Sequence, residues 1–288
     1  MDWTSYAPAK VNLSLNITGR REDGYHNLVS FAAFTLYSDQ LTVSDDTLEG
    51  LTISGPFSAE LKNNLENNLI LKTKQVVLAA GFSPQTHHIH LEKHIPISSG
   101  LGGGSSNVAA YLRCLADMMA LSPSEKYHLF SLAGDIGTDV PVCLQPGYQI
   151  MEDTGTNVRP AKMSEGKLYC ALTNPGISVS TASIFSALQD KDFSSDKKPF
   201  PKRAELQLKD VLAHGNDLYR PAIQTCPEIA ILRDQIQQSS VASQLIGTGM
   251  SGSGASCFAL STSKDVIRQL CDELTTNGYW AVATRLIN

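Results

Sequence analysis

A glycine-rich segment at residues 100–106 is the part of the chain best suited to bind an anion. It has the sequence Gly-Leu-Gly-Gly-Gly-Ser-Ser, and apolar residues at helical spacing follow it from Asn107 to Ala120. Glycines permit positive φ angles and leave backbone N–H groups uncovered. At the start of a helix such N–H groups bind phosphate by hydrogen bonding and through the helix dipole. The segment therefore predicts a phosphate-binding loop, with an ordinary flexible turn as the alternative.

The usual nucleotide-binding motifs do not account for this loop. The chain has no Gly-x-x-x-x-Gly-Lys-Ser/Thr string, and it lacks the His-Arg-Asp and Asp-Phe-Gly strings of protein kinases. Residues 247–252 match Gly-x-Gly-x-x-Gly, but a dinucleotide site needs a helix directly after the glycines. Here a strand is expected to follow. We interpret this second segment as a tight turn between strands or as a loop that contacts a phosphate.

Two charged residues, Lys10 and Asp139, have a defined place in the expected strands and helices. Lys10 starts a stretch in which polar and apolar residues alternate through Ile17, which predicts a half-buried strand with Lys10 and Asn12 on its polar face. Asp139 follows Gly137, where one helix is expected to end and another to begin. An aspartate near a helix N-terminus is favoured as the anion that can accept a proton. On the residues alone, Lys10 would be a surface lysine on this strand and Asp139 a simple helix cap, and these remain the alternatives to any catalytic role.

The composition narrows the class of protein and of partner. The 288 residues are 42% hydrophobic and 18% charged, with a net charge of −5, which disfavours a protein that coats nucleic acid. No apolar run is long enough to span a bilayer, and the first residues do not resemble a secretory signal. The six cysteines form no Cys-x-x-Cys pair, which favours reduced thiols. We expect a cytoplasmic monomer or weak homodimer without nucleic-acid or membrane partners.

The pattern of elements predicts an α+β protein with two domains. A weak pattern between residues 155 and 166 suggests domains at 1–155, for ATP binding and catalysis, and at 156–288, for closing the site and binding substrate. A polar, exposed loop is expected over residues 190–202. The expected strands cover residues 11–17, 28–36, 89–93, 168–173, 255–260 and 280–286, and the expected helices cover 68–80, 107–120, 122–137, 181–188 and 265–277.

Three segments resemble the signature segments of the GHMP kinases, a family of galactose, homoserine, mevalonate and phosphomevalonate kinases. They are residues 8–13 (Pro-Ala-Lys-Val-Asn-Leu), residues 96–106 and residues 249–254 (Gly-Met-Ser-Gly-Ser-Gly). Residues 19–26, 135–141 and 174–176 are in addition similar to the members that act on a cytidine diphosphate-linked methylerythritol. The similarity runs from about Pro8 to Leu260. It departs from the pattern at Ser98, Ser99, Thr138 and Ala182.

The resemblance implies a fold and a reaction. The fold would be the two-domain α+β GHMP-kinase fold, with an N-terminal domain like domain 2 of ribosomal protein S5 and a ferredoxin-like C-terminal domain. The reaction would transfer the γ-phosphate of ATP, carried with Mg²⁺, to the 2-hydroxyl of the cytidine-linked alcohol in non-mevalonate isoprenoid biosynthesis. The alternatives are a mevalonate- or homoserine-type kinase and a catalytically silent nucleotide-binding regulator.

The resemblance also implies roles for individual residues. Asp139 would be the catalytic base, and Lys10 would be its partner. The cytidine would stack between Tyr25 and Phe185 while His26 reads its polar edge. The substrate-binding residues would be Asn12, Tyr25, His26, Thr181 and Phe185. The ATP-binding residues would be Asn68, Lys93, Pro96, Ser99, Gly100, Leu101, Gly102, Gly103, Gly104, Ser105 and Ser106. The loop near the transferring phosphate would comprise Gly249, Met250, Ser251 and Gly252.

A group of histidines could be mistaken for a metal site. His87, His88, His90 and His94 lie close to Glu92 in the sequence, and zinc uses such ligands. Alternation places His88, His90 and Glu92 on one strand face, which we interpret as the solvated face of an edge strand. No metal held by the protein alone is therefore expected.

Overall fold

The computed structural model describes residues 1–45, 49–62, 65, 68–189, 192–194, 200–201 and 205–288. Two compact units interleave along the chain. The first unit comprises Met1–Ala9, Ser38–Ile97 and Gly102–Gln145, and the second comprises Lys10–Tyr37, Ser98–Leu101 and Pro146–Asn288. The functional division expected at residue 155 stays a prediction. The sequence allows Asn67 as well as Asn68 to cap the helix expected over residues 68–80. Asn67 and most of the loop expected over residues 190–202 lie outside the described residues.

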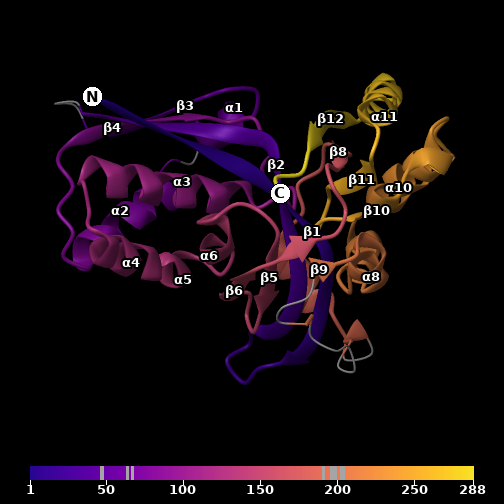
Figure 1. Ribbon diagram of the computed structural model, residues 1–288, viewed down its shortest axis with the longest axis horizontal. Helices are drawn as coiled ribbons and strands as arrows, with labels where there is room; N and C mark the ends of the chain where they lie inside the picture. Colours follow the sequence, from indigo (N-terminus) through magenta and orange to yellow (C-terminus); the bar gives the residue numbers. More distant parts are fainter. Residues whose placement is uncertain (46–48, 63–64, 66–67, 190–191, 195–199, 202–204) are drawn as a thin grey trace. The chain divides into compact units, whose positions relative to one another are not determined.

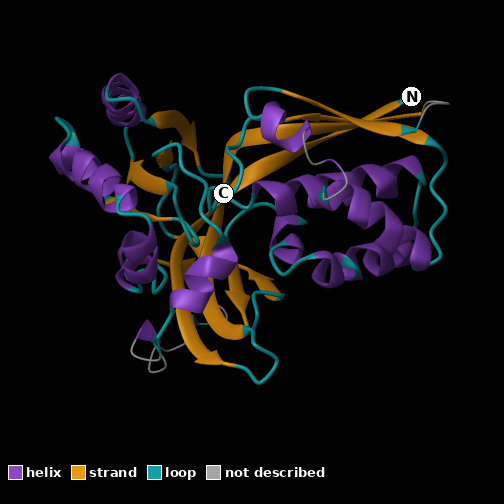
Figure 2. Ribbon diagram, turned by 180° about the vertical axis from the view of Figure 1, so that it is seen from behind, coloured by secondary structure: helices purple, strands orange, loops and turns teal. Residues whose placement is uncertain are grey.

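The long strands β1 (Asp2–Arg20) and β2 (His26–Asp45) each contribute to both units. In the first unit, the end of β2 pairs antiparallel with β4 (His87–Glu92), and β4 pairs parallel with β3 (Gly50–Ser54). Helices gather on one face of these strands (Figures 1 and 2). The helices of this unit are α1 (Ser58–Lys62), α2 (Leu69–Ala79), α3 (Gly103–Met118), α4 (Pro123–Ser131), α5 (Ala133–Ile136) and α6 (Val140–Cys143).

The local signals explain where these helices begin and end. Ser122 and Glu125 form the expected capping box at the start of α4. That helix ends at Ser131, short of the expected end near Gly137, and α5 follows as a separate turn. The expected start of α3 at Asn107 is also wrong. The helix begins at Gly103, because Gly102 takes the left-handed conformation and serves as the N-cap, so the last glycines of the loop are its first turn.

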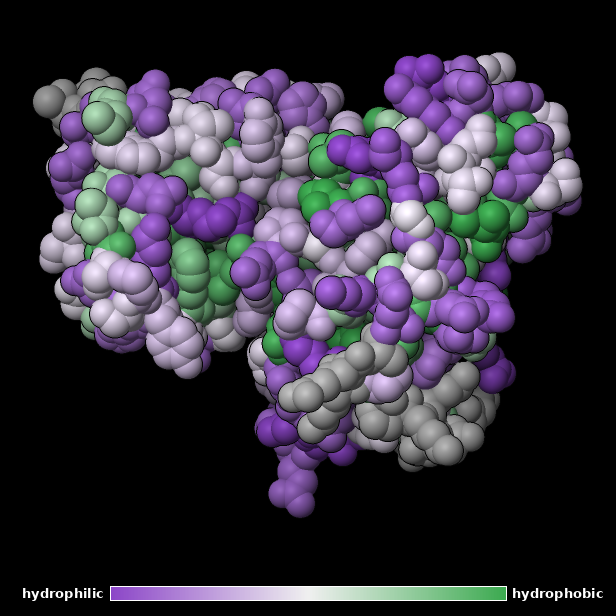
Figure 3. Space-filling view, in the orientation of Figure 1, coloured by the Kyte–Doolittle hydropathy of each residue, from purple (hydrophilic) through white to green (hydrophobic). Residues whose placement is uncertain are grey.

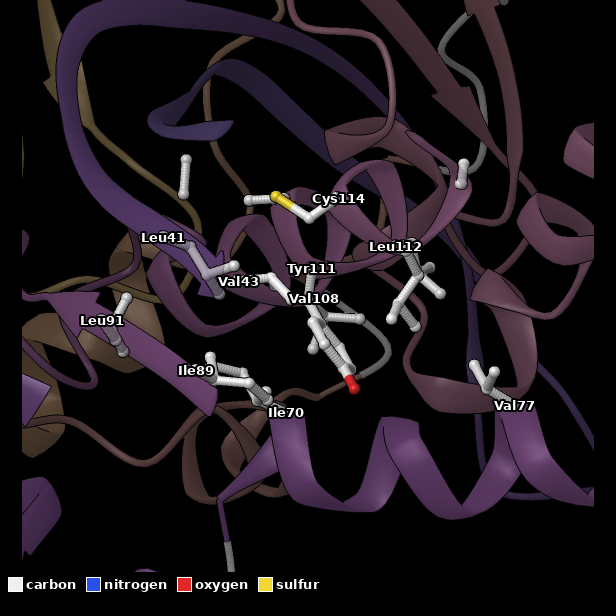
Figure 4. Packing of buried hydrophobic residues seen from close by; sticks show 14 of the residues in the cluster. Leu41, Val43, Ile70, Val77, Ile89, Leu91, Val108, Tyr111, Leu112 and Cys114 are labelled. Carbon is white, nitrogen blue, oxygen red and sulfur yellow. The ribbon is translucent and has the colours of Figure 1, made fainter. Parts of the chain in front are cut away.

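The core of the first unit lies between the sheet and α3 (Figure 4). Leu41 and Val43 of β2 and Ile89 and Leu91 of β4 are buried, as the alternation along each strand requires. Tyr111 of α3 is fully buried, and it is the largest side chain in this cluster. The expected apolar spacing of α3 is confirmed, and it fixes this helix, which carries the end of the glycine loop, against the sheet.

A buried histidine on β4 makes the stability of this unit depend on pH. The Gln85 carbonyl can only accept, so His87 Nδ1 carries the proton (2.7 Å) and Nε2 accepts from the Tyr111 hydroxyl (2.8 Å). Burial, aided by the charge of Lys74, lowers the pKa of His87 below 6.5. As pH falls below 6.5, the unfolded chain therefore gains a proton that the folded chain does not.

We expect the free energy of unfolding to decrease as the pH is lowered. The protonation of His87 in the unfolded chain should account for a decrease of up to about 1.4 kcal/mol between pH 7.5 and pH 5.5. Urea unfolding at the two pH values measures the fall. His87→Gln is expected to flatten the dependence, whereas His90→Gln, on the exposed face of the same strand, is the matched control. Equal slopes for wild type and His87→Gln would contradict the prediction.

The second unit contains a four-stranded antiparallel sheet in the order β10-β11-β8-β12. Its strands are β8 (Tyr169–Asn174), β10 (Gly247–Met250), β11 (Cys257–Ser261) and β12 (Trp280–Arg285), and α11 (Lys264–Thr276) connects the last two. Numbered along the chain, the order is 2-3-1-4 with helical connections after the first and third strands. This is the ferredoxin-like arrangement, so that expectation is confirmed.

The remaining elements of the second unit connect this sheet to β1 and β2. β5 (Gln149–Glu152) pairs with the first half of β2 and with β6 (Asn157–Pro160). The others are β7 (Lys162–Met163), β9 (Glu205–Leu206), α7 (Thr181–Ala187), α8 (Leu208–Ala213), α9 (Tyr219–Thr225), α10 (Glu228–Gln238) and the 3₁₀ helix η3 (Ala242–Gln244). Within the described residues, the strand that follows the Gly-x-Gly-x-x-Gly string confirms that no helix begins there.

Hydrophilic and near-neutral residues occupy most of the face shown in Figure 3. None of the helices in the described part of the chain is both long enough and apolar enough to cross a bilayer.

Candidate active site

Parts of the three signature segments meet within the second unit. The Lys10 amide donates to the carbonyl of Leu101 (2.8 Å). The Asn12 amide donates to Oγ of Ser251 (3.1 Å), which in turn donates to the carbonyl of Gly100 (2.9 Å). The fully buried Ser251 hydroxyl therefore links β1 to both glycine-rich segments. The sequence separates these residues by up to 239 positions, and the fold brings them into one hydrogen-bonded group.

Close backbone packing explains the glycine at position 100. Gly100 has φ +77°, and a Cβ there would collide with the carbonyl oxygens of Ser251 and Gly254. Any side chain would push the two segments apart. Ser98 has φ +50°, which is rare for a residue other than glycine. Ser98 is one of the positions that depart from the family pattern.

Asn12 presents an acceptor that the protein leaves unused. Its Nδ2 donates to the Ser30 hydroxyl (2.7 Å), which donates to the carbonyl of Ser14 (2.6 Å). The Oδ1 atom is buried and has no hydrogen-bond partner among the described residues, although Asn12 is only 2% exposed. An unpaired buried acceptor is costly for folding. A donor on a ligand or a bound water would satisfy this acceptor, and the substrate-binding role expected for Asn12 stays a prediction.

The start of α3 presents the donors expected for phosphate. Gly102 has φ +64°, and no side chain caps the helix. The first N–H groups of an α-helix have no partner within the helix, so those of the first turn can face a ligand. The Ser106 hydroxyl is fully buried and donates to the carbonyl of Pro8 (2.7 Å). Its proton is therefore used inside the protein, and the ATP contact expected for Ser106 stays a prediction.

Lys93 is a buried residue, not a lysine on an open strand face. It is 3% exposed and forms an ion pair with the fully buried Asp39 of β2. Burial lowers the pKa of Lys93, and the charge of Asp39 opposes this shift. Nζ also lies against the start of α3, since a Cβ on Gly103 would be 2.8 Å away. Lys93 thus supports the first turn of the phosphate-binding helix.

Asp39 holds this region together and was missed in the sequence. Its Oδ1 accepts from the backbone amides of His94 (2.7 Å) and Ile95 (2.8 Å). Its Oδ2 accepts from Lys93 and from Nδ2 of Asn107 on α3 (2.8 Å). The available signal was an acidic residue in the interior of β2, whose other acidic residue, Asp45, is its last residue. A fully buried carboxylate requires partners of this kind.

Two other predicted residues occupy helix N-termini. Asn68 is the N-cap of α2, and its Oδ1 accepts from the amide of Ile70 (2.9 Å). Asn68 therefore caps α2, and its contact with ATP stays a prediction. Asp139 is the N-cap residue of α6, but its side chain makes no capping hydrogen bond. The carboxylate of Asp139 therefore does not serve as a helix cap, which was the alternative to a catalytic role.

The residues expected to bind cytidine lie at the β1–β2 turn and on α7. The His26 ring is 5.4 Å from that of Phe185 and 5.8 Å from that of Phe193, which sequence reasoning missed. Tyr25 is 58% exposed, so its ring is open to a ligand. The Thr181 hydroxyl lies 2.9 Å from that of Ser253, which ties α7 to the Gly249–Gly254 loop.

His26 has a defined protonation state. Nε of Arg20 can only donate, so Nε2 of His26 accepts (3.3 Å). Burial lowers the pKa of His26, and the charge of Arg20 lowers it further. The imidazole is therefore neutral at pH 7 with its proton on Nδ1, which is a donor suited to an acceptor on the edge of a pyrimidine.

The histidine group on β4 needs one correction. β4 lies between β3 and β2, so it is an inner strand and not the expected edge strand. His90 bonds to the hydroxyls of Thr52 and Ser54 on β3. In the described ranges, no three His, Cys, Asp or Glu side chains come together as metal ligands.

Comparison with known proteins decides the family. The family models "GHMP kinases N terminal domain" and "GHMP kinases C terminal" match residues 68–147 and 203–279. The 4-diphosphocytidyl-2-C-methyl-D-erythritol kinase of Granulibacter bethesdensis is 37% identical, over 96% of this chain and 92% of that protein. The chain belongs to the 4-diphosphocytidyl-2-C-methyl-D-erythritol kinase family of GHMP kinases.

Solved structures agree with membership of this kinase family. A crystal structure of 4-(cytidine 5′-diphospho)-2C-methyl-D-erythritol kinase has a TM-score of 0.78 and 32% identity, covering 99% of this chain and 100% of that chain. A homoserine kinase from Cytophaga hutchinsonii has a TM-score of 0.63 at 17% identity, covering 99% of this chain and 94% of that chain, and shares the fold alone. The predicted two-domain GHMP-kinase fold is confirmed.

Proposed function

We propose that this kinase transfers the γ-phosphate of ATP to the 2-hydroxyl of 4-diphosphocytidyl-2-C-methyl-D-erythritol, giving ADP and the 2-phosphate, in non-mevalonate isoprenoid biosynthesis. The observation that carries the proposal is the similarity along nearly the whole chain to proteins of that name. The neutral His26 beside Phe185 supports a cytidine site. Mg²⁺ enters with ATP as part of the substrate.

In the proposed mechanism, the oxygen of the substrate 2-hydroxyl bonds to the γ-phosphorus of ATP while the bond from that phosphorus to ADP breaks. Asp139 accepts the proton of the hydroxyl in this step, and ADP leaves. Lys10 neutralises charge on the transferring group. The first turn of α3 binds the ATP phosphates, and the Gly249–Gly252 segment contacts the group in transfer. Such catalysis depends mainly on positioning and charge neutralisation. Asn12 Oδ1 accepts a hydrogen bond from the substrate.

One assay tests the substrate. ADP release is measured with ATP, Mg²⁺ and the cytidine diphosphate substrate, in parallel with mevalonate, homoserine and galactose. Activity on the cytidine substrate alone is the expected result. Equal activity on mevalonate or homoserine would contradict the proposal, and no ADP release with any alcohol would favour a nucleotide-binding regulator.

Tyr25→Ala is expected to raise the KM for the cytidine substrate by about 5- to 160-fold, because stacking on a base contributes about 1–3 kcal/mol. The KM for ATP is expected to stay unchanged. Steady-state kinetics with each substrate varied measures both values. Tyr127→Ala, which removes an 80% exposed tyrosine from α4, is the matched control. An unchanged KM for the cytidine substrate would favour a kinase for a smaller alcohol.

The cytoplasmic location, the monomeric or weakly dimeric state and the lack of nucleic-acid partners stay predictions from the sequence.

A further inference from the structure

The segment Gly215–Leu218, between α8 and α9, connects β1 to the Gly249–Gly254 loop. The Leu15 amide donates to the carbonyl of Gly215, and the Asp217 amide donates to the carbonyl of Leu15 (both 2.9 Å). Nδ2 of Asn216 donates to two carbonyls of the loop, those of Met250 and Gly252 (both 2.9 Å). These residues all belong to the second unit. One side-chain amide therefore fixes two peptide groups of the loop.

We propose that Asn216 is a positioning residue that holds this loop in the shape required to contact the phosphoryl group in transfer. The inference rests on the proposed function. In a trans peptide, the C=O and N–H groups point to opposite sides. Binding the Gly252 carbonyl therefore turns the Ser253 N–H away from Asn216. The orientation of this N–H, a donor suited to phosphate, is set by a side chain that contacts no substrate.

The neighbouring Asp217 connects the same segment to β1 by hydrogen bonds. Its Oδ2 accepts from the amide of Ile17 (2.8 Å), and its Oδ1 accepts from Nδ2 of Asn16 (3.1 Å) and from the Ser194 hydroxyl (2.9 Å). β1 also carries Lys10 and Asn12, near its middle. The segment Gly215–Leu218 therefore binds both β1, through Asp217, and the Gly249–Gly254 loop, through Asn216.

Two substitutions of Asn216 share one loss, that of the side-chain N–H donors. Asn216→Asp keeps an oxygen that can accept from the Leu218 amide, as Oδ1 does now (2.9 Å), but loses both donors. Asn216→Ala loses the donors and the acceptor without adding charge. An effect common to both variants therefore identifies the two hydrogen bonds to the loop. Asn277→Asp, an exposed asparagine at the end of α11, is the control for added charge in the same unit.

Steady-state kinetics is expected to show a kcat about 10- to 100-fold lower for both Asn216 variants, because each lost hydrogen bond is worth about tenfold. The KM values are expected to stay within about twofold, as for an interaction made in the transition state. Calorimetry then compares Mg²⁺–ADP with Mg²⁺–ADP plus aluminium fluoride, which mimics the group in transfer. Affinity for ADP should be unchanged, and affinity for the aluminium fluoride complex should fall by the same factor as kcat.

The outcomes separate this inference from the proposed function. If wild type does not phosphorylate the cytidine substrate, the proposed function fails, and the aluminium fluoride comparison still tests the loop. If the Asn216 variants keep kcat within about twofold of wild type, the inference is wrong. It is equally wrong if the variants lose affinity for ADP and for the aluminium fluoride complex to the same degree, because that pattern indicates an effect on nucleotide binding and not on the group in transfer.

Discussion

Asp139→Asn is expected to lower kcat by about 10²- to 10⁴-fold, the usual contribution of a positioned general base. Asparagine has nearly the same shape as aspartate, but its amide cannot accept the proton of the substrate hydroxyl. The Asp139 side chain makes no capping hydrogen bond to α6. Loss of its charge should therefore leave that helix intact and change KM little. Single-turnover measurement of ADP formation at saturating substrate gives the chemical step directly.

The neighbouring carboxylate provides a matched control. Asp135 lies on α5 and is exposed. Asp135→Asn removes the same charge close by in the sequence, and we expect kcat to change by less than about twofold. If Asp139→Asn also retained most of its kcat, the hydroxyl proton would have to leave without Asp139. Catalysis would then rest on positioning and charge alone, as a largely dissociative transition state permits.

Features of the site encoded in consecutive residues were predictable from the sequence. Alternation identified the strand that carries Lys10 and Asn12, and the capping box identified the start of α4. The expected half-buried character of that strand is wrong, because both of its faces are buried from Ala7 to Ile17, and Lys10 is only 3% exposed. The glycine loop was recognised from composition, since only glycine tolerates a position such as that of Gly100. In each case one short segment contains the whole physical cause. The start of α3 was misplaced because glycine has a low intrinsic helix propensity, which tertiary packing overrides.

Features that depend on distant pairs were not predictable. Asp39 and Lys93 are 54 residues apart, and Asn216 and Met250 are 34 apart. Each side chain alone has the type expected for an exposed position. Nothing local distinguishes a surface lysine from one whose counter-charge comes from another strand. The buried side chains that support the glycine-rich segments were therefore missed, whereas the segments themselves were recognised.

Asp39→Ala is expected to lower the free energy of unfolding by about 3–5 kcal/mol, because it leaves a buried ammonium without its partner. It also removes the acceptor of the His94 and Ile95 amides. Lys93→Met should cost less, since Asp39 would keep these two amides and Nδ2 of Asn107 as donors. Urea unfolding of both single variants and the double variant gives the coupling energy of the pair. Equal losses for the two single variants would contradict this order.

The pH dependence of the Asp39→Ala variant separates the lost charge from the lost hydrogen bonds. Asp39 raises the pKa of Lys93 against the effect of burial, so its removal lets that pKa fall further. The unfolded chain then binds a proton that the folded chain does not, and stability rises with pH up to the ordinary lysine value near 10.4. The difference in free energy of unfolding between Asp39→Ala and wild type should therefore be smaller at pH 9 than at pH 7.

The cost of the two unpaired amides has no such dependence on pH, because amides do not titrate in this range. A stability difference that stays constant with pH would mean that Asp39 acts only by accepting hydrogen bonds from the backbone. A difference that decreases as the pH rises would mean that Asp39 also stabilises the charged form of Lys93 next to the first turn of α3.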